Sequence, residues 1–262
     1  ADRALILRFD GNHRRALVDQ IVAGLDRPSK IARWGENSIA MSLPTTGAVI
    51  GIDLDRPDPI VLAEELGRPQ GLTTDLDGSV VVCDAGDDQL VRITEDGALG
   101  VIAGTGFTGL VDGPAAAAEL AQPVAVTRTA HGLVFCDAGS NNLRLLTDKG
   151  RVHTVTDSSF TRMGLIDGPA HKAVLQRPTG VAALSDGSLI VADTGNHRLR
   201  LVSDERVKTL GVAGLNAPEG VTEVREGLVL VADTGNHRLV MVDLDDHRVW
   251  IPDVIGLSSP TA

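Results

Sequence analysis

The chain contains no tyrosine, and aromatic residues make up only 2% of its 262 positions. This scarcity argues against the aromatic platforms on which single-stranded nucleic acids stack. Basic residues are also outnumbered, 24 against 35 acidic ones, which gives a net charge of −11. Because this charge repels a phosphate backbone, we do not expect general nucleic-acid binding.

Long apolar runs are absent as well. No window of eighteen or more apolar residues occurs, so we expect no membrane span. The N-terminus lacks the basic segment and apolar run of an intact signal peptide. The sequence therefore predicts a soluble domain, which we expect to be monomeric.

The most informative feature that is present is a repeated string. Val-Ala-Asp-Thr-Gly-Asn-His-Arg occurs at residues 191–198 and again at 231–238. An eight-residue repeat at that spacing is typical of propellers and solenoids. Weaker copies begin at Cys83 and Cys136, and a shortened copy begins at Asp10. The sequence therefore predicts one array over the whole chain.

A proline followed by a short apolar run precedes each copy, at Pro28, Pro69, Pro123, Pro178 and Pro218. Between one proline and the next, four short segments rich in Val, Leu and Ile alternate with turn residues, which predicts four strands. Four-stranded units of this length around an axis are propeller blades. A sandwich or an open solenoid is the alternative, and the regular four-strand units disfavour it.

The two ends of the chain supply the parts of one further unit. Residues 1–25 contain three candidate strands, and Val254–Pro260 resembles the lead-in Val212–Pro218 to an innermost strand. We therefore expect an all-β, six-bladed β-propeller of four-stranded antiparallel blades, closed by joining the N- and C-terminal segments, as a single domain over residues 1–262. The predicted blades are residues 1–25 plus the C-terminal tail, 28–67, 69–121, 123–176, 178–216 and 218–252.

The only two cysteines, Cys83 and Cys136, occupy the second-strand position that Ala192 and Ala232 hold in later blades. Equivalent positions in adjacent blades should lie about 10 Å apart. A disulfide requires α-carbons within about 7 Å. We therefore expect two free thiols in the core.

These turns, the proline-led Gly-Val strands and the Asp-Gly-Pro-Ala insertions resemble the NHL-repeat propellers, most strongly over Pro178–Val242. The chain is most similar to bacterial NHL propellers that follow a thioredoxin-like domain, although it has neither that domain nor a Cys-x-x-Cys pair. The resemblance implies either a binding propeller or an enzyme such as a lactonase or lyase. Lyases of this repeat family use a tyrosine and three histidines, and this chain has no tyrosine.

The Asp and His of the turn look like a catalytic pair, but their repetition in successive blades favours a structural role. The short carboxylate can accept backbone N–H bonds, and the glycine can adopt a left-handed conformation. His13, His197 and His237 should lie about 7 Å outward from the innermost strands, too far apart for zinc, which needs nitrogens at about 2.1 Å. We predict no catalytic residue, metal or cofactor. The residues assigned to the structural turn are Asp84, Asp137, Asp193, Asn196, His197, Asp233, Asn236 and His237.

Two connections between blades are longer than the others, with extra residues at 109–120 and 164–175. Alanines after Gly-Pro predict a short helix in each, with Asp112 or Asp167 satisfying its free amides. Both connections should emerge on the face that holds the signature turns. That face is where we expect ligands, with a purely structural role as the alternative.

The residues before the blade-leading prolines should gather at the mouth of the axial channel, and three of them are arginines. Each arginine could pair with a turn carboxylate such as Asp84 or Asp193, or the arginines could together hold a small anion or an acidic group of a partner protein. The sequence favours a non-catalytic binding propeller for a protein or small anionic ligand. The alternative is a six-bladed enzyme, lactonase-, hydrolase- or lyase-like, with its site at the channel mouth. The candidate ligand residues are Arg27, Arg68, Gln122 and Arg177.

Overall fold

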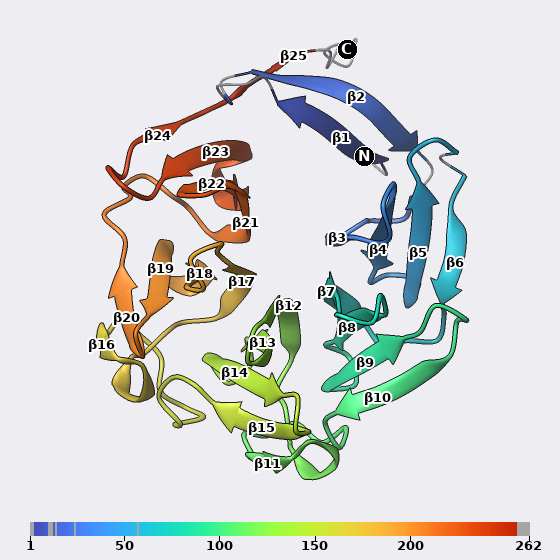
Figure 1. The fold of residues 1–262 in the computed structure, drawn as a ribbon. Helices are drawn as coiled ribbons and strands as arrows, with labels where there is room; N and C mark the ends of the chain where they lie inside the picture. Colours follow the sequence, from blue (N-terminus) through green and yellow to red (C-terminus); the bar gives the residue numbers. More distant parts are fainter. Residues whose placement is uncertain (1–2, 10–12, 14, 24, 57, 256–262) are drawn as a thin grey trace.

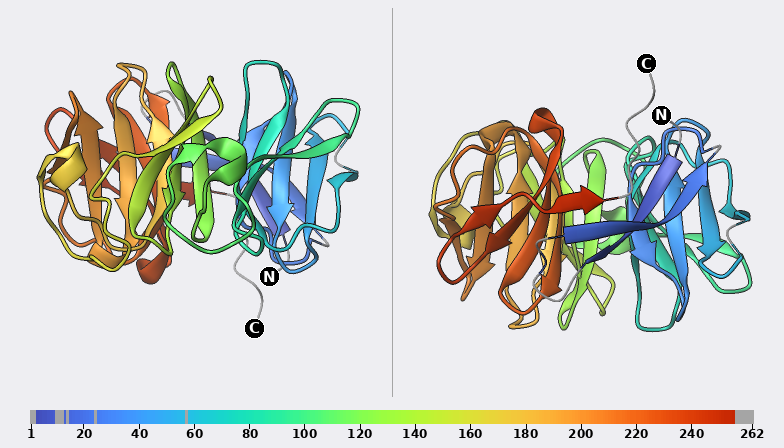
Figure 2. Two further views of the ribbon diagram at one scale, coloured as in Figure 1. Left: turned by 90° about the horizontal axis from the view of Figure 1, so that it is seen from below. Right: turned by 90° about the horizontal axis from the view of Figure 1, so that it is seen from above.

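The computed structural model describes residues 3–9, 13, 15–23, 25–56 and 58–255, and these form an all-β propeller (Figure 1). Five blades surround a central axis, and the strands within each blade run roughly along that axis (Figure 2). The first strand of each blade lies nearest the axis, and the following strands succeed one another outward. No α-helix occurs in the described ranges.

The first, second and fifth blades have four strands each. The first comprises β3 (Ile31–Arg33), β4 (Ser38–Leu43), β5 (Ala48–Asp53) and β6 (Ile60–Ala63). The second comprises β7 (Pro69–Thr74), β8 (Val80–Asp84), β9 (Gln89–Ile93) and β10 (Leu99–Ala103). The fifth comprises β21 (Pro218–Arg225), β22 (Leu228–Asp233), β23 (Arg238–Asp243) and β24 (Val249–Trp250).

The third and fourth blades have five strands, because the preceding connection adds a two-residue outermost strand. The third comprises β12 (Pro123–Thr129), β13 (Gly132–Asp137), β14 (Asn142–Thr147), β15 (Arg151–Thr154) and the added β11 (Gly113–Pro114). The fourth comprises β17 (Pro178–Ala183), β18 (Leu189–Asp193), β19 (Arg198–Ser203), β20 (Arg206–Thr209) and the added β16 (Gly168–Pro169).

The prediction of six four-stranded blades is wrong. The chain ends form a separate three-stranded sheet of β1 (Arg3–Phe9), β2 (Arg15–Ala23) and β25 (Asp253–Ile255), in the order β1-β2-β25. Val254 was expected to begin a lead-in to an innermost strand. Instead it pairs with Ala16, so that β25 runs parallel to β2 at the edge of the sheet remote from β1. The terminal sheet bridges the first and fifth blades, and the predicted closing strand after Ile255 lies outside the described residues.

The inserted connections contain short 3₁₀ turns rather than α-helices: η1 (Ala115–Ala117) and η2 (Ala170–Lys172). Two further turns, η3 (Thr194–Asn196) and η4 (Thr234–Asn236), lie within the signature string. Asp112 does not cap η1. Its carboxylate accepts hydrogen bonds from the Thr154 N–H at 2.8 Å and from Arg144 at 2.9 Å. The insertion is therefore fastened to the outer strands of the third blade.

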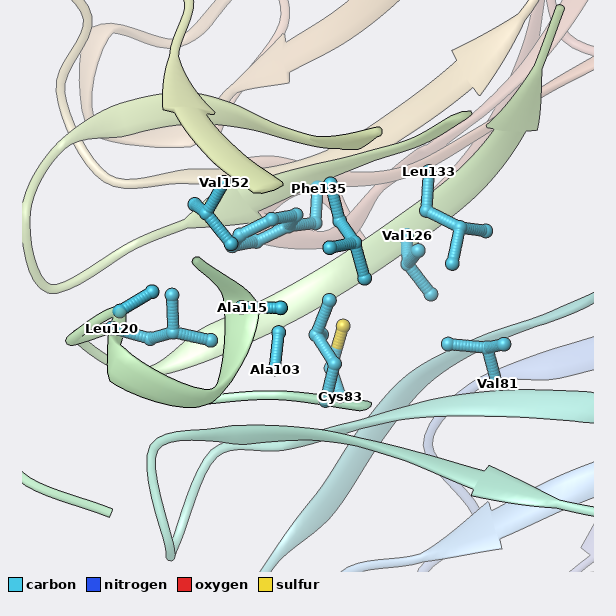
Figure 3. Close-up of a cluster of buried hydrophobic side chains, with 12 residues drawn as sticks. Val81, Cys83, Ala103, Ala115, Leu120, Val126, Leu133, Phe135 and Val152 are labelled. Atoms are coloured by element: carbon cyan, nitrogen blue, oxygen red, sulfur yellow. The ribbon is translucent and has the colours of Figure 1, made fainter. Parts of the chain in front are cut away.

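The core is divided into layers between neighbouring blades. In the layer between the second and third blades, Cys83 of β8 faces Phe135 of β13, and Ala115 of the inserted turn covers the outer side (Figure 3). Cys136 lies in the next layer, and both cysteines are free and fully buried. Burial raises the pKa of both thiols. The predicted core thiols therefore match the structure.

Candidate functional site

A cavity of about 390 Å³ opens at the axial mouth of the propeller. We call it the mouth cavity. Its walls come from residues one or two positions away from the blade-leading prolines, together with the turn residues Ala138 and Thr234 and the strand residue Ala232. The lining residues are Ser29, Lys30, Arg68, Gln70, Gln122, Val124, Ala138, Arg177, Thr179, Glu219, Gly220, Ala232 and Thr234.

The structure brings together three of the four predicted ligand residues. Arg68, Gln122 and Arg177 line the mouth cavity, whereas Arg27 does not. Ala217, which precedes Pro218, also lies outside the lining, and Ser259, which precedes Pro260, lies outside the described residues. The mouth is therefore asymmetric, with its positive charge contributed by the first, second and fourth blades.

The backbone before the prolines is held in an uncommon conformation. Gln122 has φ 52°, Arg177 has φ 47° and Ala217 has φ 44°, in the left-handed region that non-glycine residues rarely adopt. In each case the N–H donates to a turn side chain of the preceding blade. The acceptors are Asp88 for Gln122 at 2.6 Å, Asn141 for Arg177 at 2.9 Å, and His197 Nδ1 for Ala217 at 2.8 Å. The turn side chain of one blade thus fixes the direction of the mouth residue of the next.

The arginines of the mouth have no carboxylate partner among the described residues. Within the described part of the chain, Arg68 and Arg177 form no ion pair. Asp84 instead accepts the backbone N–H of Arg68 at 2.7 Å, and the Arg68 guanidinium donates to the Ala85 carbonyl at 3.4 Å. The pairing of mouth arginines with turn carboxylates, considered from the sequence, is therefore not formed here. Both guanidinium groups remain exposed for another acceptor.

Lys30 adds a third positive charge, which the pre-proline pattern does not predict. Its ammonium lies across the channel from its own strand and donates to the carbonyls of Glu219 at 3.1 Å and Thr179 at 3.4 Å. Burial lowers the pKa of Lys30, and the neighbouring Glu219 carboxylate opposes that shift. Glu219 is the one acidic side chain of the described lining. Two guanidiniums and one ammonium thus face a single carboxylate.

A signal for Lys30 was present in the repeat. The second residue after the leading proline is Gly71, Ala125, Gly180 or Gly220 in the other four blades, but Lys30 in the first. Small residues are needed there because a Cβ at Gly71 would overlap the backbone of Ala125 in the next blade. A lysine at this position breaks the repeat where the strands approach the axis most closely.

The carboxylates of the signature turns accept hydrogen bonds from backbone N–H groups of the preceding connection. Asp137 accepts the Ala121 N–H at 2.7 Å, Asp193 accepts the Gln176 N–H at 2.8 Å, and Asp233 accepts the Asn216 N–H at 2.7 Å. Asn196 and Asn236 each donate to the aspartate of their own turn at 2.8 Å. His197 and His237 adopt left-handed backbone, with φ 57° and 53°. No group of three or more His, Cys, Asp or Glu suited to a metal occurs among the described residues.

The NHL repeat family matches residues 175–200, which contain the lead-in, innermost strand and signature turn of the fourth blade. The chain is an NHL-repeat β-propeller. No curated protein matches this NHL propeller. In the described ranges it has no helix with the length and apolar character needed to cross a bilayer.

Solved structures share the fold at low sequence identity. A catalytically inactive virginiamycin B lyase from Staphylococcus aureus, bound to quinupristin, is 12% identical, with a TM-score of 0.66 over 97% of this chain and 79% of the lyase. A chain of a nidogen–laminin complex is 17% identical, with a TM-score of 0.71 over 93% and 86%. A gluconolactonase from Xanthomonas campestris is 17% identical, with a TM-score of 0.66 over 86% and 76%. The fold is therefore common to enzymes and to a protein–protein complex.

Proposed function

We propose that this NHL propeller is a non-catalytic binding protein that holds a small anion, or an acidic group of a partner protein, in the mouth cavity. The observation that supports this most directly is that Arg68, Arg177 and Lys30 line one cavity whose described lining contains a single carboxylate. In a chain with a net charge of −11, three cations around one cavity are a local exception. Guanidinium groups without an acidic partner offer paired N–H donors that match carboxylate and phosphate oxygens.

Each cation has a defined place in the proposal. The backbone N–H of Arg177 donates to Asn141 Oδ1, which fixes the direction of this residue. Arg68 is positioned by the two hydrogen bonds that its backbone N–H and its guanidinium donate within the second blade. Lys30 lines the cavity, and its ammonium donates to two carbonyls. A ligand oxygen can approach the ammonium from the cavity side without displacing those bonds, because an ammonium has three donors.

The test is calorimetric titration with phosphate, acetate and citrate, together with the shift in melting temperature that ligand binding produces. We expect binding that is abolished in the Arg68→Ala/Arg177→Ala double variant. Arg151→Ala, which removes an exposed arginine on β15, is the matched control and should bind as the wild type does. If no anion binds, or if the control loses as much affinity as the double variant, the proposal fails. Turnover of a lactone or of quinupristin would contradict its non-catalytic part.

The pH dependence gives a second, independent readout. Because the pKa of Lys30 is lowered from its usual 10.5, the ammonium loses its proton at a lower pH than an ordinary lysine does. Anion affinity should therefore fall as the pH rises toward 10.5, while both arginines stay charged. In Lys30→Met the affinity should be weaker at neutral pH and should no longer fall over that range. An identical pH profile in the two proteins would remove Lys30 from the site.

A further inference from the structure

A second cavity adjoins the mouth cavity at the point where the ring of blades is interrupted. It has a volume of about 410 Å³ and lies between the inner strands of the fifth blade and those of the first. We call it the end groove. Its described lining includes Val221, Leu230 and Leu239 from the fifth blade and Ile31 and Met41 from the first. The groove is therefore walled mainly by aliphatic side chains.

The two cavities are adjacent and share part of their lining. Ser29, Lys30, Gly220 and Ala232 line both of them. Lys30 thus lines the mouth cavity together with Arg68 and Arg177, and it also lines the end groove. A ligand with a negative head and an apolar body could occupy both cavities at once, with the change from polar to apolar at Lys30.

The apolar wall of the end groove consists of side chains that would be buried in any other blade. Ile190, Ala192 and Leu199 of the fourth blade are fully buried against the fifth. Their counterparts Leu230, Ala232 and Leu239 are only half-buried. Apolar surface of this kind, beside a charged cavity, is the usual composition of a small-molecule pocket.

We infer that the site takes an anionic amphiphile, such as a medium-chain carboxylate, with its charged group in the mouth cavity and its alkyl chain in the end groove. This inference rests on the proposed function and specifies its ligand class. Charge complementarity places the head group, since Arg68 and Arg177 lack acidic partners in the described part of the chain. The lining residues that the two cavities share, Lys30 and Gly220 among them, place the alkyl chain in the adjacent groove. The reasons against a plain inorganic anion are the size and the apolar lining of the adjoining groove.

The experiment is a calorimetric series of straight-chain carboxylates from butanoate to decanoate, kept below their micelle concentrations. Burial of one methylene is expected to tighten binding about fourfold, until the groove is filled. Decyltrimethylammonium, which has a chain of similar length and a positive head, should bind far more weakly than decanoate. Equal affinity across the series, or equal affinity for the cationic amphiphile, would overturn the inference.

Two variants separate this inference from the proposed function. Leu239→Gln places an amide in the groove and should weaken decanoate about tenfold while leaving acetate and phosphate binding unchanged. Leu99→Gln, at an exposed leucine on β10 of the second blade, is the matched control and should change neither. If short anions bind through Arg68 and Arg177 but chain length has no effect, the ligand class is wrong and the anion site stands. If no carboxylate or phosphate binds at all, the proposed function itself fails.

Discussion

The fourth and fifth blades contain the same eight-residue signature, yet the structure surrounds the two copies differently. Seven residues after the signature aspartate, the fourth blade has Arg200 and the fifth has Val240. Arg200 is fully buried and joins Asp193 at 2.5 Å to Asp167 at 2.8 Å. In the fifth blade Asp233 is paired with the partly exposed Arg238 at 2.6 Å. One string thus supports a buried charge network in one blade and a peripheral ion pair in the next.

The two aspartates differ accordingly in their proton affinity. Burial raises the pKa of Asp193, and this effect exceeds the opposing hydrogen bonds from Asn196, Gln176 and Arg200. Burial acts in the same direction on Asp233, but hydrogen bonds from Asn216, Asn236 and Arg238 outweigh it and lower the pKa. Identical local sequence therefore does not fix the electrostatics of the turn. The electrostatics also depend on the inserted connection, which occurs only beside the third and fourth blades and supplies Asp167 as a second partner for Arg200.

The largest difference should appear when each arginine is removed. Arg200→Met leaves Asp193 buried without its cation and should lower the free energy of unfolding by about 3–5 kcal/mol. Arg238→Met removes a partly exposed partner and should cost about 1 kcal/mol or less. Urea unfolding measures both. Adding Asp193→Asn to Arg200→Met should recover part of the loss, since the uncompensated charge is then gone. Equal costs for the two single variants would show that the blades are electrostatically equivalent.

A smaller effect should distinguish the packing of the innermost strand in the fifth blade from that in the fourth. A Cβ at Gly180 of the fourth blade would overlap the carbonyl oxygen of Glu219 in the fifth. At the equivalent Gly220 the nearest atom is the Cβ of Ala232, at 3.3 Å. Gly180→Ala should therefore cost about 1–3 kcal/mol through overpacking, whereas Gly220→Ala should change stability by no more than about 0.5 kcal/mol. Comparable losses at the two positions would mean that both glycines are packed against backbone.

Much of this architecture could be predicted because the repeated residues occupy equivalent positions in successive blades. The second-strand residues, the signature turn and the pre-proline positions follow from spacing alone, and three of the four predicted mouth residues line one cavity. The blade count failed because Val254–Pro260 was matched to the lead-in Val212–Pro218 by composition. Pairing of Val254 with Ala16 depends on where β2 lies in space. The similarity between two short stretches of sequence does not contain that information.

The candidate site was predicted only where it follows the repeat. Lys30 was missed because it departs from the small residue expected two positions after the proline, and its bonds reach strands about 150 or more residues away in sequence. The roles of Asp112 and Asp167 were also misjudged. Their partners Arg144 and Arg200 lie in the following blade, so the buried network becomes visible only in three dimensions.

The smallest perturbation tests the exposed wall of the fifth blade most directly. Cysteine is naturally accommodated at this second-strand position, as Cys83 and Cys136 show, so Ala192→Cys and Ala232→Cys should each change stability by about 0.5 kcal/mol or less. Only a thiolate that solvent can reach reacts quickly with a disulfide reagent. Ala192 is fully buried, whereas Ala232 is half-buried and lines both cavities.

We therefore expect rapid labelling of the Ala232→Cys variant without denaturant, and labelling of the Ala192→Cys variant only after unfolding. The two native thiols are the internal control, since burial raises their pKa and should keep them unreacted in both variants. Mass spectrometry of digested protein assigns the label to its position. Added decanoate should slow the reaction of the Ala232→Cys variant if the alkyl chain occupies the end groove. Equal labelling at the two introduced thiols would mean that the fifth blade is covered as completely as the fourth, and the end groove would then be unavailable to any ligand.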